Sequence, residues 1–151
     1  MRIVTFNLRY SWDGDGINSF LHRGAMIYQK IREERPDVIA FQEVTEKNFD
    51  FLSKSLSDIY DMHVRFRSVT FDGEGLAIAF LKSNTELVNI ESFWLSPTPG
   101  VPGSRYPSQS DCPSICVVAV FREFASGRVI RICNTHLDHR SEQARVLGVM
   151  S

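Results

Sequence analysis

The sequence predicts a mixed α/β fold in which a strand–helix–strand unit is followed by a β-rich layer. The first observation is an alternating strand at residues 2–9, a helical period over 20–34 and a short apolar run at 38–41. The second is a series of short apolar or alternating segments after residue 60. The third is size: 151 residues, 43% hydrophobic and 23% charged, describe one domain with a single core.

The N-terminal unit is of the α/β type. Residues 2–9 form its first strand and residues 20–34 its helix, which Pro36 closes because the residue before a proline disfavours the helical conformation. The apolar run 38–41 is its second, buried strand. A second helix is expected over 47–56, where apolar residues recur at helical spacing.

The rest of the chain is predicted to be rich in strands. The expected strands are 62–66, 76–81, 87–95, 115–124 and 129–133. Their close spacing favours an antiparallel layer with a hairpin around 125–127. Residues 96–113 form a long loop with all but one of the six prolines, and loops of that length are usually functional or mobile. Ser141 is expected to cap a helix that runs toward Met150.

Charge and cysteine content exclude several classes of protein. The 17 Lys plus Arg and 18 Asp plus Glu give a charge of −1, which argues against a strongly basic, sequence-independent nucleic-acid binder. Three cysteines are no disulfide framework and indicate reduced thiols. The N-terminal apolar run is too short for a signal peptide or a membrane span. We therefore expect a cytoplasmic protein without a membrane span, and we predict no protein partner.

Two polar residues follow apolar strands. Asn7 and Glu43 end the two strands of the N-terminal unit, and carboxylate and amide oxygens are the hard ligands that Mg²⁺ prefers. The alternative is that Asn7 satisfies the backbone of a turn and that Glu43 begins the next helix.

A third polar cluster, residues 134–139, follows the strand 129–133. A histidine there, such as His136, can donate a proton or a hydrogen bond to a phosphate oxygen. A zinc site from His136 and His139 is the alternative, but that spacing requires a helix, whereas the apolar approach indicates the end of a strand. Glu74, in the turn that starts at Asp72, could orient the histidine, or it could belong to an ordinary polar hairpin.

Four motifs in this order resemble the endonuclease/exonuclease/phosphatase superfamily. They are residues 3–9, 36–44, 74–78 and 134–139. Its members are metal-dependent phosphoesterases, among them deoxyribonuclease-I-like nucleases, abasic-site endonucleases, mRNA deadenylases, sphingomyelinases and inositol polyphosphate 5-phosphatases. The resemblance implies a two-layer β-sandwich flanked by helices. Residues 93–99 further resemble a bacterial branch of the superfamily.

The resemblance also implies roles for the residues that match the motifs. Glu43 would be the principal ligand of Mg²⁺ or Mn²⁺, and Asn7 would help to bind metal or water near the scissile phosphate. His136 would hydrogen-bond a phosphate oxygen or act as general acid, and Glu74 would pair with it. The resemblance further implies substrate-binding positions at Arg9, which would approach the substrate phosphate, and at Asn134, which matches its motif and can equally serve backbone structure.

The chain departs from the family pattern in two respects. The later Gly-Asp-Phe-Asn and Ser-Asp-His segments, which hold and activate the attacking water, have no counterpart. Residues 1–151 would therefore be the N-terminal part of a single domain, incomplete at the C-terminus, either a fragment or a truncated product. Ser114 also stands where the family pattern has an arginine.

Two functions remain open at this point. The first is a metal-dependent hydrolase of phosphodiesters or phosphomonoesters, a nuclease or a phosphatase, that is inactive as this fragment. The second is a non-catalytic module that binds phosphate or metal. The substrate would be a small phosphoester or a nucleic acid. The charge of −1 and the single short basic cluster at Arg65 and Arg67 favour the small molecule.

Overall fold

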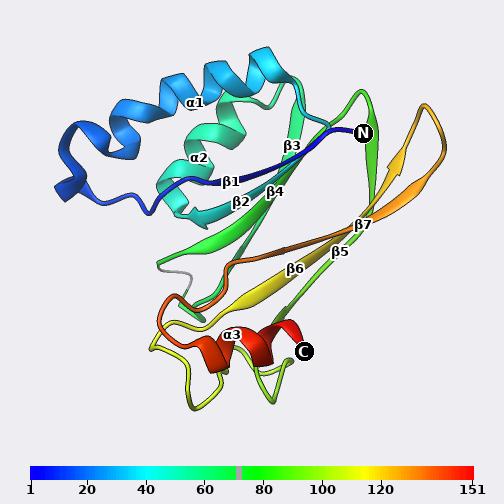
Figure 1. Cartoon of the computed structure of the whole chain (residues 1–151). Coiled ribbons are helices and arrows are strands. Elements are labelled where there is room, and N and C mark those ends of the chain that lie inside the picture. The colour runs from blue at the N-terminus through cyan, green and yellow to red at the C-terminus, as the bar shows by residue number, and fades with distance from the viewer. Residues whose placement is uncertain (71–72) are drawn as a thin grey trace.

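The computed structural model describes residues 1–70 and 73–151 and has two β-sheets with helices around them (Figure 1). The described strands are β1 (Ile3–Asn7), β2 (Val38–Val44), β3 (Tyr60–Phe66), β4 (Gly75–Leu81), β5 (Thr85–Trp94), β6 (Ile115–Glu123) and β7 (Val129–Thr135). The described helices are the 3₁₀ helix η1 (Asp13–Asn18), α1 (Phe20–Glu34), α2 (Glu46–Ser55) and α3 (Glu142–Val149). This arrangement confirms the predicted α/β class with two β layers and flanking helices.

The first sheet contains the strand–helix–strand unit, with the strand order β1-β2-β4-β3. β1 and β2 are parallel, as a crossover through α1 requires, and Asn7 lies opposite Gln42. β2 and β4 are antiparallel, and every residue of β4 is buried. The assignment of β3 and β4 to a separate antiparallel layer is therefore wrong. The apolar β4 is a central strand of the first sheet, because both of its faces are covered.

The second sheet is antiparallel, with the order β5-β6-β7. The predicted hairpin between β6 and β7 is confirmed, and Gly127 has a φ of 68° in its turn. Glycine suits this position because it has no Cβ to clash in the left-handed region.

Helices α1 and α2 lie along the outer face of the first sheet (Figure 1). They contribute Ile27, Ile31, Leu52 and Leu56 to the core beneath them. α2 begins after a capping box in which the Thr45 hydroxyl accepts from Asn48 N–H and the Asn48 side chain accepts from Thr45 N–H. None of the helices in the described residues is long and apolar enough to cross a membrane.

A second core lies between the two sheets. Ile78 and Phe80 of β4 pack there with Val117 and Phe121 of β6. Phe80 and Phe121 have ring centroids 5.4 Å apart, a favourable aromatic separation. This apolar layer fixes the second sheet against the first.

One polar side chain crosses this layer. Asn134 of β7 is 2% exposed, and its amide donates to the carbonyl oxygens of Phe41 (3.0 Å) and Ala77 (3.1 Å) in the first sheet. Its Oδ1 accepts from Gln42 Nε2 at 2.8 Å. The pairing of β2 with β4 shifts register between Phe41 and Val44, and Asn134 supplies hydrogen bonds at that irregularity.

Replacement of Asn134 by alanine is expected to destabilise the chain by about 2–3 kcal/mol, because buried carbonyl groups lose their donor. Urea unfolding followed by circular dichroism measures this loss. Asn89→Ala, at an exposed position of β5, is the matched control and should change stability by less than about 0.5 kcal/mol. Equal stability of the two variants would contradict the role of Asn134 as a link between the sheets.

Candidate active site

Asn7 and Glu43 meet at one edge of the first sheet. The carboxyl ends of the parallel strands β1 and β2 lie side by side there, which is where α/β proteins form their sites. Asn7 Nδ2 donates to Glu43 Oε1 at 2.7 Å, and Tyr10 N–H donates to Glu43 Oε2 at 2.6 Å. Asn7 Oδ1 accepts from Arg9 N–H at 2.8 Å, so Asn7 also satisfies the turn, as one of the two interpretations expected.

The backbone at Glu43 is unusual. Its φ is 55°, in the left-handed region, and it lies within the register shift of β2. A non-glycine residue in this region costs about 1–3 kcal/mol, a strain that clusters at functional sites. Glu43 does not begin α2, because Thr45 caps that helix. The bulge instead turns the Glu43 carboxylate toward Asn7 and Tyr10.

The surroundings of Glu43 keep its carboxylate ionised. Partial burial opposes ionisation, but the hydrogen bonds from Asn7 and Tyr10 and the charges of His136 and Arg9 outweigh it, so the pKa of Glu43 lies below its ordinary value. An ionised carboxylate at neutral pH is the form that binds a divalent cation.

His136 reaches the same place from the second sheet. It follows β7 directly, and its Nε2 lies 3.6 Å from Glu43 Oε1, within ion-pair range although long for a hydrogen bond. The predicted convergence of Asn7, Glu43 and His136 is thus confirmed. Their chemical roles remain predictions.

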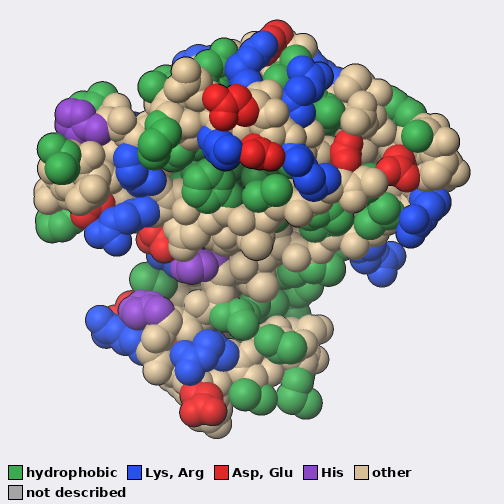
Figure 2. Space-filling model, turned by 45° about the horizontal axis from the view of Figure 1, so that its top comes forward, with side chains coloured by type: hydrophobic (Ala, Val, Ile, Leu, Met, Phe, Trp, Pro, Cys, Tyr) green, Lys and Arg blue, Asp and Glu red, His purple; other side chains and the backbone are tan. Residues whose placement is uncertain are grey.

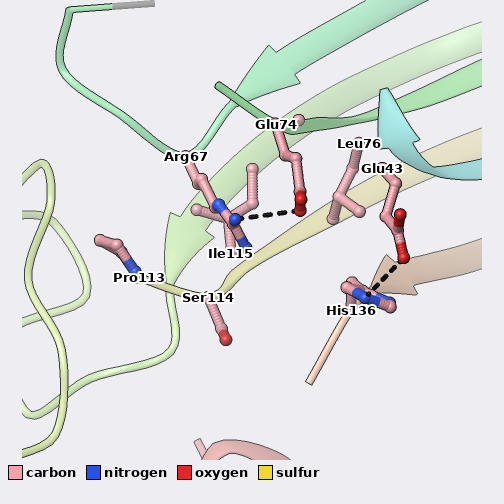
Figure 3. Close-up of a pocket in the computed structure, with 9 residues that line it drawn as sticks. Glu43, Arg67, Glu74, Leu76, Pro113, Ser114, Ile115 and His136 are labelled. Carbon is pink, nitrogen blue, oxygen red and sulfur yellow. Dashed lines mark ion pairs between the residues drawn. The ribbon is translucent and has the colours of Figure 1, made fainter. Parts of the chain in front are cut away.

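Glu43 and His136 border a pocket of about 260 Å³, and Asn7 is joined to it through its hydrogen bond to Glu43. Figure 2 shows histidine and acidic side chains at the narrowing between the two parts of the molecule. The close-up in Figure 3 shows two ion pairs, His136 with Glu43 and Arg67 with Glu74, with Leu76 between them. All four charged residues line this pocket.

The expected pairing of Glu74 with His136 is wrong. Glu74 Oε2 lies 3.0 Å from Arg67 Nη2 instead. Arg67 N–H also donates to the Glu74 carbonyl at 3.2 Å, so the two residues face each other just beyond the paired ends of β3 and β4. The strands can approach closely there because Gly75 has no Cβ. A Cβ at this position would lie only 2.5 Å from the Arg65 carbonyl oxygen. Asp72 lies outside the described residues.

Arg67 lines this pocket, although the sequence predicts it only as part of a short basic cluster with Arg65. The sequence does carry a signal for this pair. Arg67 follows the predicted strand 62–66 and Glu74 precedes the predicted strand 76–81, so the two residues would face each other if these strands formed a hairpin. Ser114, where the family pattern has an arginine, lines the same pocket, and its hydroxyl accepts from Gln109 Nε2 at 3.0 Å.

The two predicted substrate-binding positions lie elsewhere. Arg9 forms a bidentate pair with Asp15 of η1, Nε to Oδ2 at 2.8 Å and Nη2 to Oδ1 at 2.7 Å. Its contact with a substrate phosphate remains a prediction. Asn134 is buried between the sheets, where its amide is committed to protein groups. The geometry therefore favours the structural role over direct contact with a substrate.

Asp138 lines the pocket, but its carboxylate accepts hydrogen bonds mainly from backbone N–H groups. It is 5% exposed and accepts from Ser110 N–H (2.9 Å), the Ser110 hydroxyl, Arg140 N–H (2.8 Å) and Ser141 N–H (2.6 Å). Burial disfavours the charge, but these hydrogen bonds outweigh it and hold the pKa of Asp138 well below its usual range. Asp138 thus joins the loop 96–113 to the start of α3.

The donor set in the described residues suits a hard cation bound through one protein carboxylate. No group of three or more His, Cys, Asp or Glu side chains within 1–70 and 73–151 is arranged to hold a metal. His136 and His139 both line the pocket, but they follow a strand and lie on no helix. Mg²⁺ is commonly bound by one or two carboxylates together with water and substrate phosphate, so Glu43 fits such an ion. Asn7, with its amide nitrogen on Glu43, orients that ligand.

Two solved structures share the fold of nearly the whole chain. An endonuclease/exonuclease/phosphatase from Bacteroides vulgatus is 29% identical with a TM-score of 0.92, and the match covers 99% of this chain and 57% of that protein. The mannosyl-6-phosphatase of Bacteroides thetaiotaomicron is 26% identical with a TM-score of 0.90, over 99% of this chain and 56% of that protein.

A curated protein also matches. An uncharacterized protein of Acanthamoeba polyphaga mimivirus is 29% identical over 149 residues, which cover 93% of this chain and 51% of that protein. No protein-family model matches the chain. The chain thus spans between about half and three-fifths of the length of these relatives.

The depressed pKa of Asp138 predicts a defined pH dependence of stability. Because its pKa is about 3.9 in the unfolded chain and lower in the folded chain, its contribution is complete above pH 4 and is lost as the pH falls through the folded value. We expect Asp138→Asn to destabilise the chain by about 2–3 kcal/mol at pH 7. That difference from wild type should shrink below pH 4.

Urea unfolding of wild type and Asp138→Asn at pH 7, 4 and 3 measures this dependence. Asp111→Asn is the control, since the side chain of Asp111 is 98% exposed in its pair with Arg105. A stability difference for Asp138→Asn that is the same at all three pH values would contradict the assignment.

Proposed function

We propose that the chain, which belongs to the endonuclease/exonuclease/phosphatase superfamily, supplies metal-binding and proton-donating groups of a phosphoesterase that hydrolyses a phosphodiester or a phosphomonoester. The observation that carries the proposal is that Asn7 and His136 both meet Glu43, and that Glu43 and His136 line one pocket. Asn7 and Glu43 lie in β1 and β2 of the first sheet, and His136 directly follows β7 of the second sheet. The similarity to the B. thetaiotaomicron mannosyl-6-phosphatase supports a reaction at a phosphoester.

Glu43 would hold Mg²⁺ or Mn²⁺. Such an ion, when bound, polarises a phosphoryl oxygen and stabilises the charge that develops there. Asn7 and Tyr10 N–H hold the two carboxylate oxygens of Glu43 in place. Because the Glu43 carboxylate is already held in position, it loses less conformational entropy when it binds the ion. This favours metal binding at a site with one protein carboxylate.

His136 would donate a hydrogen bond or a proton to an oxygen of the phosphate. It lies at the border of the pocket, with its Nε2 3.6 Å from Glu43 Oε1. A positioned donor of this kind stabilises an oxygen that gains negative charge in the transition state.

The described residues offer no further acidic group suited to activate water. Glu74 is paired with Arg67, and Asp138 is surrounded by hydrogen-bond donors. Catalytic groups that act as a unit are not additive, so the lack of a base forfeits most of the acceleration. We therefore propose that residues 1–151 by themselves bind metal and phosphate but hydrolyse phosphoesters slowly.

A small phosphoester is the proposed substrate class. The pocket volume of about 260 Å³ suits a phosphate with a small ester group. On the face shown in Figure 2, Lys and Arg side chains are interspersed with Asp and Glu, and the described side chains form no continuous basic track there. A nucleic-acid backbone requires such a track for affinity.

Glu43→Gln is expected to weaken Mg²⁺ binding by the chain at least a hundredfold, because the amide loses the charge. The variant should still unfold cooperatively, at a lower temperature than wild type, because its NH₂ group faces one of the two donors that the carboxylate accepts from. Titration calorimetry with Mg²⁺ and with Mn²⁺ measures the affinity. Glu91→Gln, at an exposed position of β5, is the control with the same loss of charge. Metal affinity unchanged in Glu43→Gln would remove Glu43 from the metal site.

The chain is expected to hydrolyse bis-p-nitrophenyl phosphate at least a hundredfold more slowly than a product whose reading frame continues past Ser151 and supplies the Gly-Asp-Phe-Asn and Ser-Asp-His segments. The assay compares the two proteins with Mg²⁺ and adds sugar phosphates and DNA as substrates. Full activity of residues 1–151 would mean that His136 or His139 serves as the base. Salt-dependent cleavage of DNA without any activity on small phosphoesters would contradict the substrate class.

A further inference from the structure

The charges that line the pocket are unbalanced for an anionic substrate. Three carboxylates, Glu43, Glu74 and Asp138, line it together with one guanidinium, that of Arg67, and the imidazoles of His136 and His139. A phosphate that approaches a metal at Glu43 presents further negatively charged oxygens on its other side. Those oxygens require donors, because burying an unpaired charge is costly.

Arg67 is built to supply such donors. It is held by Glu74 at 3.0 Å, and both side chains are only about one-fifth exposed, at 21% and 20%. A guanidinium carries five N–H groups in a planar fork that matches the geometry of phosphate. The contact with Glu74 uses the Nη2 end of that fork. Reduced exposure to water strengthens each interaction that the group makes.

The backbone of Arg67 is fixed from both sheets. Its N–H donates to the Glu74 carbonyl in the first sheet, and its own carbonyl accepts from Trp94 Nε1 of β5 at 3.0 Å. A side chain on a rigid support holds its productive position with little loss of entropy on binding. Arg67 is therefore a preformed group rather than a surface arginine that happens to lie near the pocket.

We propose that Arg67, held in place by Glu74, contacts the phosphate group of the substrate from the side opposite Glu43 and His136. The proposal rests on the proposed phosphoesterase function and adds a specific substrate-binding residue to it. Both ion pairs line the pocket of about 260 Å³, so a phosphate placed there has a donor on each side (Figure 3).

The same pair also indicates where the rest of the substrate lies. Arg67 and Glu74 line a neighbouring cavity of about 470 Å³, which Tyr10 and Asp111 also border. A phosphate on Arg67 therefore has space for its ester group in this cavity. Its aromatic and acidic walls suit a small polar group with hydroxyls, which can pack on a ring and donate to a carboxylate.

The test is the affinity of residues 1–151 for inorganic phosphate in the presence of Mg²⁺, measured by calorimetry for four proteins. We expect Arg67→Ala to raise the Kd for phosphate by about tenfold to a hundredfold, because a bidentate charged contact is lost. Arg65→Ala, two residues away and bordering a different cavity, should stay within about twofold of wild type. Circular dichroism and thermal unfolding show whether each variant is folded.

The double variant Arg67→Ala with Glu74→Gln separates direct contact from the general electrostatic field. It removes one positive and one negative charge, so the net charge of the pocket equals that of wild type. Affinity as weak as in Arg67→Ala supports direct contact, whereas affinity restored to that of wild type overturns it.

The remaining outcomes also decide between the two proposals. If wild type binds phosphate and Arg67→Ala binds it as Arg65→Ala does, the role of Arg67 is wrong and the proposed function stands. If wild type binds neither Mg²⁺ nor phosphate, the proposed function fails, and the role of Arg67 fails with it.

Discussion

The irregularity of β2 at Glu43 is the constraint on which the site depends. β2 pairs regularly with β4 up to Phe41 and resumes only at Val44, and between them Glu43 adopts a positive φ. A regular strand would place alternate side chains on the two faces of the sheet, and the Glu43 carboxylate would then not reach Asn7 and Tyr10. The bulge costs backbone strain, and it places the carboxylate where Asn7 and Tyr10 can hold it.

Asn134 connects this irregularity to the second sheet. It hydrogen-bonds Phe41 and Gln42 of β2, and His136 follows it by two residues. Side chains two positions apart point to the same side of an extended chain, so the buried amide that anchors β7 also directs His136 toward Glu43. The interaction that joins the layers is thereby the one that assembles the site. A change in the packing of the sheets would separate the two halves of the pocket.

Electrostatics divide the acidic residues around the pocket into distinct tasks. Glu43 is partly exposed and held ionised, which leaves it available to a cation. Glu74 is neutralised by Arg67, and Asp138 is enclosed by N–H and O–H donors that join a long loop to α3. The carboxylate thus serves cation binding at Glu43, orientation of Arg67 at Glu74 and anchoring of a loop at Asp138. The number and type of hydrogen-bond donors around each carboxylate decide which of these tasks it performs.

The sequence by itself determined the elements and most of the candidate site. Apolar periodicity placed the helices and strands to within a few residues, since hydrophobic burial acts locally along each element. The position of Asn7, Glu43 and His136 after apolar strands was enough to predict that they meet, because sites in α/β proteins form where strands end, here at the ends of strands from both sheets. Only the tertiary structure decided which sheet β3 and β4 join, since an alternating strand such as β3 and an apolar strand such as β4 can be accommodated in either sheet. The hairpin order of β3 and β4 in the sequence permits the pair of Arg67 and Glu74, but only the tertiary structure decided that Glu74 takes this partner rather than His136, because the choice depends on strand register.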